Sequence, residues 1–466
     1  MRSSMIPALS LLAAAGIVAA ADQPAAPAGQ TQHGPIATVL PQRWDPEKGT
    51  NIRWVADLGS ETYGGPVVAG GKVFVGTNNA KPRDPNVEGD RGVVMAFSAA
   101  DGSFLWQAIH DKLASGGESD WPLQGVCSTP WVEGDRLYYV SNRGELVAAD
   151  TEGFRDGEND GPYTDELRRG PADADLVWVL DMPRALGVRP HRMTASSPVV
   201  AGEIVYTLTS NGIGAEGKVP APGAPSFLAV SRLTGEILWK DASPGDRILD
   251  GQWSSPSVGS LAGRAQVLFP GGDGWLYAFD PQSGALLWKF DAGRVAAGPA
   301  RESLVAGAVI AQDRVYLGVG QDPEKGPGKG KLWALKGDGA GDVTATAAVW
   351  SLGGEAFSRT LSSVAVRDGL VYAADLRGFI NCLDAATGQI LWSHDLFAQV
   401  WGSPLVADGK VYIGDEDGDA TVLRAGRTKE LLHEVNMGNA IYTTPAARDG
   451  VLYIATRAKL FAIQNK

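Results

Sequence analysis

Cysteine and histidine are scarce in this chain, with two cysteines and five histidines among 466 residues. The histidines show no spacing that would place two of them on one metal ion. The sequence also lacks a Gly-x-Ser-x-Gly nucleophile turn, a glycine-rich phosphate loop and a Cys-x-x-Cys-His haem-attachment motif. The sequence therefore offers no motif-based argument for a zinc enzyme, a serine hydrolase, a nucleotide-binding protein or a c-type cytochrome.

Positive charge is also in short supply, because 41 Lys and Arg stand against 53 Asp and Glu, for a net charge of -12. Nucleic acids and anionic membranes are bound through basic surfaces, so neither is expected as a partner. No apolar run after the N-terminus is long enough to cross a membrane, and we expect no transmembrane segment.

The N-terminus has the pattern of an export signal. Arg2 precedes an apolar run from Ile6 to Ala20, and small residues lead up to Asp22. This pattern predicts a signal peptide over residues 1–21, cleaved near Ala21, and hence a periplasmic or secreted protein. Residues 22–50 are rich in Pro, Ala, Gly and Gln, and we expect a disordered or extended leader there.

Glycine and tryptophan, in contrast, are abundant, with 60 and 14 copies, and they recur at a fixed spacing. Four segments align without gaps, each with Gly followed four positions later by Trp: Gly102 and Trp106, Gly235 and Trp239, Gly284 and Trp288, Gly388 and Trp392. Weaker copies end at Trp178 and Trp350, where insertions interrupt the unit. A repeat of this length indicates a modular fold of stacked units.

A second signature occurs eight times, as a pair of small or hydroxyl residues, an apolar strand, a turn, and a second apolar strand that usually contains Tyr or Phe. The pairs are Gly64-Gly65, Ser128-Thr129, Ser196-Ser197, Ser254-Ser255, Ala306-Gly307, Ser362-Ser363, Gly402-Ser403 and Thr443-Thr444. With the Gly-x-x-x-Trp hairpin, each unit contains four antiparallel strands, which is the composition of a propeller blade.

The eighth unit ends at Ile463 with three strands, and the missing one is present ahead of the first unit at Ile52 to Val55. Joining them closes the ring and removes its free edges. We therefore predict an all-β fold, an eight-bladed β-propeller over residues 51–466, closed by an N-terminal strand and monomeric.

The repeated tryptophans are interpreted as packing residues between blades, since a large flat side chain with one polar atom suits that interface. His433 stands where blade seven should have its Trp, and we interpret it as a packing variant. Cys127 and Cys382 fall about four blades apart, too far for a disulfide, which needs Cα atoms within ~7 Å. Both are expected to be buried free thiols.

The unit that is clearest from Cys382 to Trp392 resembles the tryptophan-docking repeat of the pyrroloquinoline-quinone (PQQ)-like propeller superfamily. The resemblance covers Asn51 to Gln464 and implies a fold, but not one activity. The superfamily includes quinoprotein alcohol dehydrogenases, which carry a vicinal Cys-Cys pair and a calcium site with a catalytic Asp. It also includes BamB-type assembly lipoproteins, which have no cofactor and bind proteins.

Neither branch is matched in full. The chain has no adjacent cysteines, which disfavours quinone chemistry, and the predicted signal has no cysteine to carry a lipid anchor. The resemblance is therefore closer to the cofactor-free BamB-type scaffold.

Candidate binding residues lie at the crossings between blades, because the crossings form the central mouth of a propeller. The crossings place Arg192, Asp250, Trp253, Glu302, Arg359 and Trp401 there, together with His191, Gln252, Arg301, Gln399, Asn439 and Tyr442. One interpretation is a site for a small polar or anionic ligand, with Arg192 and Arg359 as anchors and Trp253 or Trp401 as a stacking surface. The alternative is that opposite charges pair and hold the blades together.

Two acidic segments could bind calcium. Asp156, Glu158 and Asp160 alternate ahead of Gly161 as at the start of a calcium loop, although the later ligands do not follow the pattern. The favoured alternative is a solvated acidic loop. The turn from Asp415 to Asp419 is similar, but Asp-Gly is also standard hairpin-turn chemistry.

The leading functional hypothesis is a non-catalytic scaffold that binds a protein or carbohydrate partner in the cell envelope through its central mouth and loop face. It needs no cofactor. The alternative is an oxidoreductase of the quinoprotein alcohol dehydrogenase type that uses PQQ and calcium. A hydrolase or lyase using Asp250 and Glu302 as paired carboxylates is a third hypothesis.

Overall fold

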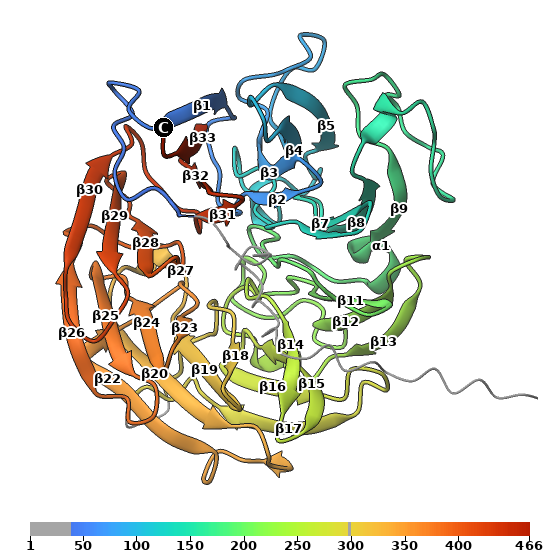
Figure 1. Cartoon of the computed structure of the whole chain (residues 1–466). Coiled ribbons are helices and arrows are strands. Elements are labelled where there is room, and N and C mark those ends of the chain that lie inside the picture. Colours follow the sequence, from blue (N-terminus) through green and yellow to red (C-terminus); the bar gives the residue numbers. More distant parts are fainter. Residues whose placement is uncertain (1–38, 297–299) are drawn as a thin grey trace, which may run out of the picture.

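The computed structural model describes residues 39–296 and 300–466, and Figure 1 looks onto the ring that they form. The predicted signal peptide and the first part of the leader lie outside these residues. Eight antiparallel sheets are arranged around one axis, and they confirm the predicted eight-bladed propeller. Within the described part of the chain, no helix is long and apolar enough to cross a membrane.

Each blade has four strands that follow one another from the axis outward. Blades one to four are β2 (Val67–Ala69), β3 (Lys72–Asn78), β4 (Arg91–Ser98) and β5 (Phe104–Asp111); β6 (Trp131–Glu133), β7 (Arg136–Val140), β8 (Glu145–Asp150) and β9 (Leu176–Asp181); β10 (Val199–Ala201), β11 (Ile204–Leu208), β12 (Phe227–Ser231) and β13 (Ile237–Asp241); β14 (Ser257–Leu261), β15 (Arg264–Pro270), β16 (Trp275–Phe279) and β17 (Leu286–Asp291). Blades five to eight are β18 (Val309–Ala311), β19 (Arg314–Val319), β20 (Lys329–Lys336) and β22 (Ala348–Ser358); β23 (Ala365–Arg367), β24 (Leu370–Ala374), β25 (Phe379–Asp384) and β26 (Ile390–Asp395); β27 (Leu405–Ala407), β28 (Lys410–Gly414), β29 (Asp419–Arg424) and β30 (Leu431–Asn436); β31 (Ala446–Arg448), β32 (Val451–Ala455), β33 (Lys459–Gln464) and β1 (Ile52–Asp57).

Several short elements lie outside this pattern, among them four 3-10 turns at Gly116–Glu118, Gly153–Arg155, Gly245–Arg247 and Pro323–Lys325. Strand β21 (Gly341–Asp342) adds to β17 in parallel, and helix α1 (Met182–Leu186) follows β9. The ring closes as predicted, since β1 pairs with β33 and places Trp54 opposite Ala462. In Figure 1 the first strand, in blue, lies beside the red C-terminal strands.

Tight turns join the inner strands of the blades. Between β27 and β28 both turn residues have positive φ, at 49° for Asp408 and 67° for Gly409. Such turns match the right-handed twist of the flanking strands, and Asp-Gly is one of the few dipeptides that adopts them without much strain.

The Gly-x-x-x-Trp repeat is a docking device between neighbouring blades. The indole of Trp350 lies on Gly388 of the following blade so closely that a Cβ there would be 2.5 Å from the ring. Trp350 Nε1 also donates to the carbonyl of Ala385, at 3.0 Å. The same arrangement joins Trp54 to Gly102, Trp178 to Gly235 and Trp239 to Gly284. The predicted packing role is confirmed for these residues.

Blade seven compensates for its missing tryptophan with a residue from outside the repeat. Trp44 is buried, with its ring centroid 5.2 Å from that of His433 and its Nε1 donating to Met437 Sδ at 3.2 Å. Leu40 is buried beside it. The composition predicts a leader over residues 22–50, but the apolar side chains of Leu40 and Trp44 pack residues 39–50 against blade seven.

The core consists of apolar clusters within and between neighbouring blades. Both cysteines are buried and free, as predicted. Burial raises the pKa of the Cys127 thiol to about 12 and that of Cys382 to about 11, so both are protonated at neutral pH.

Candidate functional site

A cavity of about 300 Å³ opens where the chain crosses from each blade to the next. All eight crossings contribute lining residues, so the cavity lies on the axis of the ring. Its wall consists of two tiers of eight residues that the sequence repeats at fixed positions.

The lower tier consists of the second residue of each small-residue pair. Its members are Gly65, Thr129, Ser197, Ser255, Gly307, Ser363, Ser403 and Thr444. Each of the six hydroxyls accepts a hydrogen bond from the backbone N–H of the equivalent residue one blade earlier, as Ser197 does from Thr129 at 2.9 Å. We call these six side chains the hydroxyl belt.

The belt is interrupted at two opposite places. Gly65 in blade one and Gly307 in blade five have no hydroxyl, so the N–H groups of Thr444 and Ser255 meet no such acceptor. The sequence marks the small-residue pairs as a repeated signature of the blades, and the belt bonds were missed. The six hydroxyls at the second position of eight pairs were the available signal.

The upper tier lies two residues earlier in each crossing, because alternate residues of an extended chain point the same way. It consists of Tyr63, Cys127, Ala195, Trp253, Val305, Leu361, Trp401 and Tyr442. The tier is asymmetric, since large aromatic rings occupy three consecutive blades on one side.

Tyr63, Trp401 and Tyr442 form an aromatic arc on blades seven, eight and one. Tyr63 stacks on Tyr442 with ring centroids 5.4 Å apart, and Trp401 lies 4.5 Å from Tyr442 and 6.1 Å from Tyr63. The Nε1 atom of Trp401 is buried and has no hydrogen-bond partner in the described residues. Burial raises the pKa of Tyr63 and Tyr442, so both phenols are neutral.

The rim of the cavity carries a charge cluster around Arg192. Its guanidinium lies 2.7 Å from Asp322 Oδ2 and 3.1 Å from Glu324 Oε2, and it packs over the ring of Trp121 at 4.9 Å. Arg192 therefore lines the mouth as predicted, but its charge is matched by two carboxylates. These carboxylates come from the loop between β19 and β20, which the crossing pattern could not identify.

The other charged candidates form ion pairs beside the cavity. Arg359 binds Glu302 through two hydrogen bonds of 3.1 and 2.9 Å. Asp250 meets His191 at 2.9 Å and Lys325 at 2.7 Å. Burial opposes ionisation of Asp250, but the hydrogen bonds from His191 and Lys325 keep its pKa below the usual value.

Three of the six predicted binding residues thus line the cavity, namely Arg192, Trp253 and Trp401, while Asp250, Glu302 and Arg359 lie outside its lining. Charge pairing explains the latter three. Asp250 and Glu302 are each held by their own basic partners, which gives no geometric support to a paired-carboxylate hydrolase.

The predicted calcium loop is held by protein contacts. Asp156 accepts from the N–H of Glu158 at 3.0 Å, whereas Asp160 forms an ion pair with Arg136 at 2.9 Å. Over residues 39–296 and 300–466, no three acidic, His or Cys side chains gather as a metal site. The geometry of the turn at Asp415 gives no more support, since Asp415 accepts the N–H of Asp419 at 3.0 Å.

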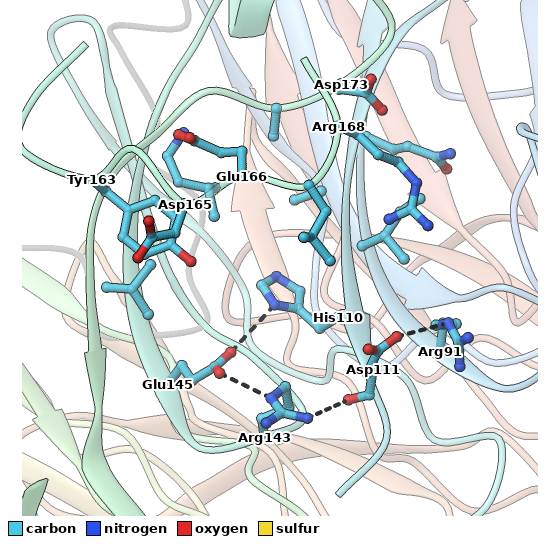
Figure 2. Close-up of a pocket in the computed structure, with 17 residues that line it drawn as sticks. Arg91, His110, Asp111, Arg143, Glu145, Tyr163, Asp165, Glu166, Arg168 and Asp173 are labelled. Carbon is cyan, nitrogen blue, oxygen red and sulfur yellow. Dashed lines mark hydrogen bonds and ion pairs between the residues drawn. The ribbon is translucent and has the colours of Figure 1, made fainter. Parts of the chain in front are cut away.

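A second pocket, of about 380 Å³, lies between the outer strand β5 of blade one and the strand β9 of blade two. Figure 2 shows the side chain of His110 facing Glu145. Tyr163, Asp165 and Glu166, from the insertion in blade two, line the part of the pocket that is drawn above this pair. His110 Nδ1 is 3.4 Å from Glu145, and its Nε2 is 3.0 Å from the hydroxyl of Tyr139.

The ionisable groups at the base of this lateral pocket are paired. Arg143 binds the second oxygen of Glu145 at 2.9 Å, and Arg91 lies 3.0 Å from Asp111. Burial opposes ionisation of Glu145, but the hydrogen bond and charge of His110 and the charge of Arg143 lower its pKa to about 2. This network fastens blade one to blade two, and we assign it a structural role.

An eight-bladed ring whose tryptophans dock on glycines of the next blade defines the class of PQQ-like β-propellers. A family model described as outer membrane protein assembly factor BamB matches residues 42–152, 171–322 and 272–466, and the chain belongs to that family.

Solved structures agree on the fold. BamB from Moraxella catarrhalis superimposes with a TM-score of 0.54 at 16% identity, covering 88% of this chain and 98% of that one. Sqt1 from Saccharomyces cerevisiae gives a TM-score of 0.57 at 11% identity, covering 89% and 99%.

One curated relative is an enzyme. The polyvinylalcohol dehydrogenase of Sphingopyxis sp. (strain 113P3) is 26% identical over 262 residues, which is 46% of this chain and 38% of that protein. The similarity therefore spans less than half of either chain.

Proposed function

We propose that this chain is an exported, non-catalytic propeller that binds a protein or carbohydrate partner of the cell envelope through the face that carries the central cavity. The observation that supports this proposal is the two-tier lining, in which all eight blades converge on one ligand-sized space. The family description, an assembly factor of the outer membrane, is consistent with partner binding in the envelope.

The chemistry of the cavity favours binding over catalysis. Arg192 is held between Asp322 and Glu324, so its charge is not free to stabilise an oxyanion. The thiol of Cys127 lines the cavity with a pKa raised by burial to about 12, which leaves almost no reactive thiolate.

Binding by this face is testable with the mature protein as bait for envelope proteins and polysaccharides. The double variant Arg192→Ala/Glu324→Ala removes the rim arginine and one of its two carboxylate partners, and Arg424→Ala/Glu430→Ala removes an exposed ion pair of blade seven as the matched control. We expect the wild type and the control to retain the same partner and the rim variant to lose it. Equal retention by all three proteins would refute binding through this face.

The second candidate is a PQQ- and calcium-dependent oxidoreductase, which the partial similarity to a dehydrogenase favours. The lining does not fit this cofactor well. PQQ carries three carboxylates, whereas the described lining has one arginine, Arg192, against the carboxylates of Asp322 and Glu324. No group of three or more acidic, His or Cys side chains that could hold a metal ion lies in the described part of the chain.

Mixing the purified protein with PQQ and calcium separates the two candidates. A scaffold gives no shift of the quinone absorbance and no alcohol-dependent reduction of a dye. Either signal, if it is lost in Trp253→Ala, would favour the oxidoreductase.

A further inference from the structure

The hydroxyl belt has an unused hydrogen-bonding capacity that faces the central cavity. Each belt oxygen accepts one backbone N–H, but no acceptor for any of the six hydroxyl protons lies among the residues that the structure describes. A hydroxyl has one proton to donate in addition to its acceptor sites. Six O–H donors therefore converge on the floor of one cavity.

A seventh donor lies in the upper tier. The Nε1 atom of Trp401 is buried without a partner in the described residues, although buried indole N–H groups are normally hydrogen-bonded. Trp401 also lines the cavity. An unsatisfied buried donor destabilises the protein unless a ligand or water accepts from it.

The aromatic arc offers the ligand a different kind of contact. Tyr63, Trp401 and Tyr442 lie together in one part of the cavity lining, and Trp253 belongs to the opposite blade. The matching ligand thus has an apolar face for the arc and several oxygen acceptors at its edge for the belt.

The charges at the rim define the ligand further. One arginine stands against two carboxylates, so an anion would enter past an excess of negative charge. A purely apolar ligand would leave the seven donors unsatisfied. The cavity volume of about 300 Å³ is at the small end for ligand sites, which suits one ring rather than an extended oligomer.

We propose that the central cavity binds a single neutral sugar ring of a carbohydrate, stacked on the aromatic arc, with its hydroxyl oxygens accepting from the hydroxyl belt and from Trp401. This proposal rests on the proposed function and names its ligand class. The first residues of the small pairs give matched controls, because Ser196 is buried inside blade three and accepts from the N–H of Leu208 at 3.1 Å, away from the cavity.

The test is calorimetric titration with neutral hexoses, N-acetylhexosamines and a uronic acid. We expect saturable binding of at least one neutral sugar and weaker binding of the uronic acid. Ser197→Ala removes one belt donor and should weaken binding about threefold to tenfold, whereas Ser196→Ala should leave the affinity unchanged. Trp401→Ala should weaken it about tenfold, and Trp401→Phe should restore part of the loss.

Thermal melts check that each variant is folded. Absence of saturable sugar binding, or equal losses in Ser196→Ala and Ser197→Ala, would overturn the proposal. If no sugar binds but the rim variant still loses a protein partner, the sugar site fails while the scaffold function stands. If no sugar binds and no partner depends on the rim, both proposals fail.

Discussion

Replacing Gly388 with alanine should destabilise the ring by much more than the same replacement in an open turn. Gly388 has φ +73°, and a Cβ there would lie 2.5 Å from the ring of Trp350. Gly409 has φ +67° with nothing within 4 Å of its Cβ position, so Gly409→Ala measures the backbone strain alone.

The difference can be estimated from these contacts. The left-handed conformation costs an alanine about 1–2 kcal/mol, which is the full effect expected for Gly409→Ala. In Gly388→Ala the indole must move, which adds about 1–3 kcal/mol of overpacking and about 1 kcal/mol for the bond from Trp350 Nε1 to Ala385. We therefore expect about 3–6 kcal/mol for Gly388→Ala.

Urea unfolding followed by tryptophan fluorescence measures both free energies of unfolding in the same buffer. If Gly388→Ala costs no more than Gly409→Ala, the ring of Trp350 does not dock on Gly388 as described. The glycine of the repeat would then be required only for the positive φ of the hairpin turn.

Three further perturbations test other parts of the fold. Trp44→Ala should cost about 3–5 kcal/mol because it empties the site beside His433. The control Leu167→Ala, at a side chain that is 90% exposed, should change stability by less than about 0.5 kcal/mol. Equal melting temperatures for the two variants would contradict the packing of residues 39–50. The folded-state pKa of Glu145 is lowered from 4.5 to about 2. Its contribution to the free energy of unfolding, about 3 kcal/mol, is therefore complete above pH 4.5 and is lost as the pH falls through 2. The stability gap between the wild type and Glu145→Gln should close on acidification. Burial raises the pKa of Asp175 from 3.8 to about 6, so ionisation of this carboxyl destabilises the folded protein. In melts between pH 4 and pH 7, Asp175→Asn should therefore be more stable than the wild type by about 2 kcal/mol at pH 7 and equally stable below pH 4.

The fold could be predicted from the sequence because each blade repeats its own local signals. The Gly-x-x-x-Trp spacing sets one hairpin, the small pairs mark the inner strands, and Trp54 supplies the strand that closes blade eight. Trp44 was missed because it belongs to no repeat, and its contact with His433 joins residues 389 positions apart.

The candidate site was predictable only in part. Trp253 and Trp401 could be placed at the mouth because crossings of a propeller meet at its axis. The partners of Arg192 could not, since Asp322 and Glu324 come from a loop whose reach depends on the folded hairpin of blade five. The belt bonds depend on the rotation between neighbouring blades, which no spacing in one chain segment encodes.

The two interruptions of the hydroxyl belt fall at opposite blade boundaries of the ring. Bonds run without a gap from blade one to blade four and from blade five to blade eight, and they are missing where Gly307 and Gly65 stand. The belt therefore consists of two four-blade arcs, and the two opposite blade boundaries between them rely on other contacts, such as the bond from Ser254 Oγ to the carbonyl of Ala306 at 3.0 Å and the ion pair of Arg457 with Glu61.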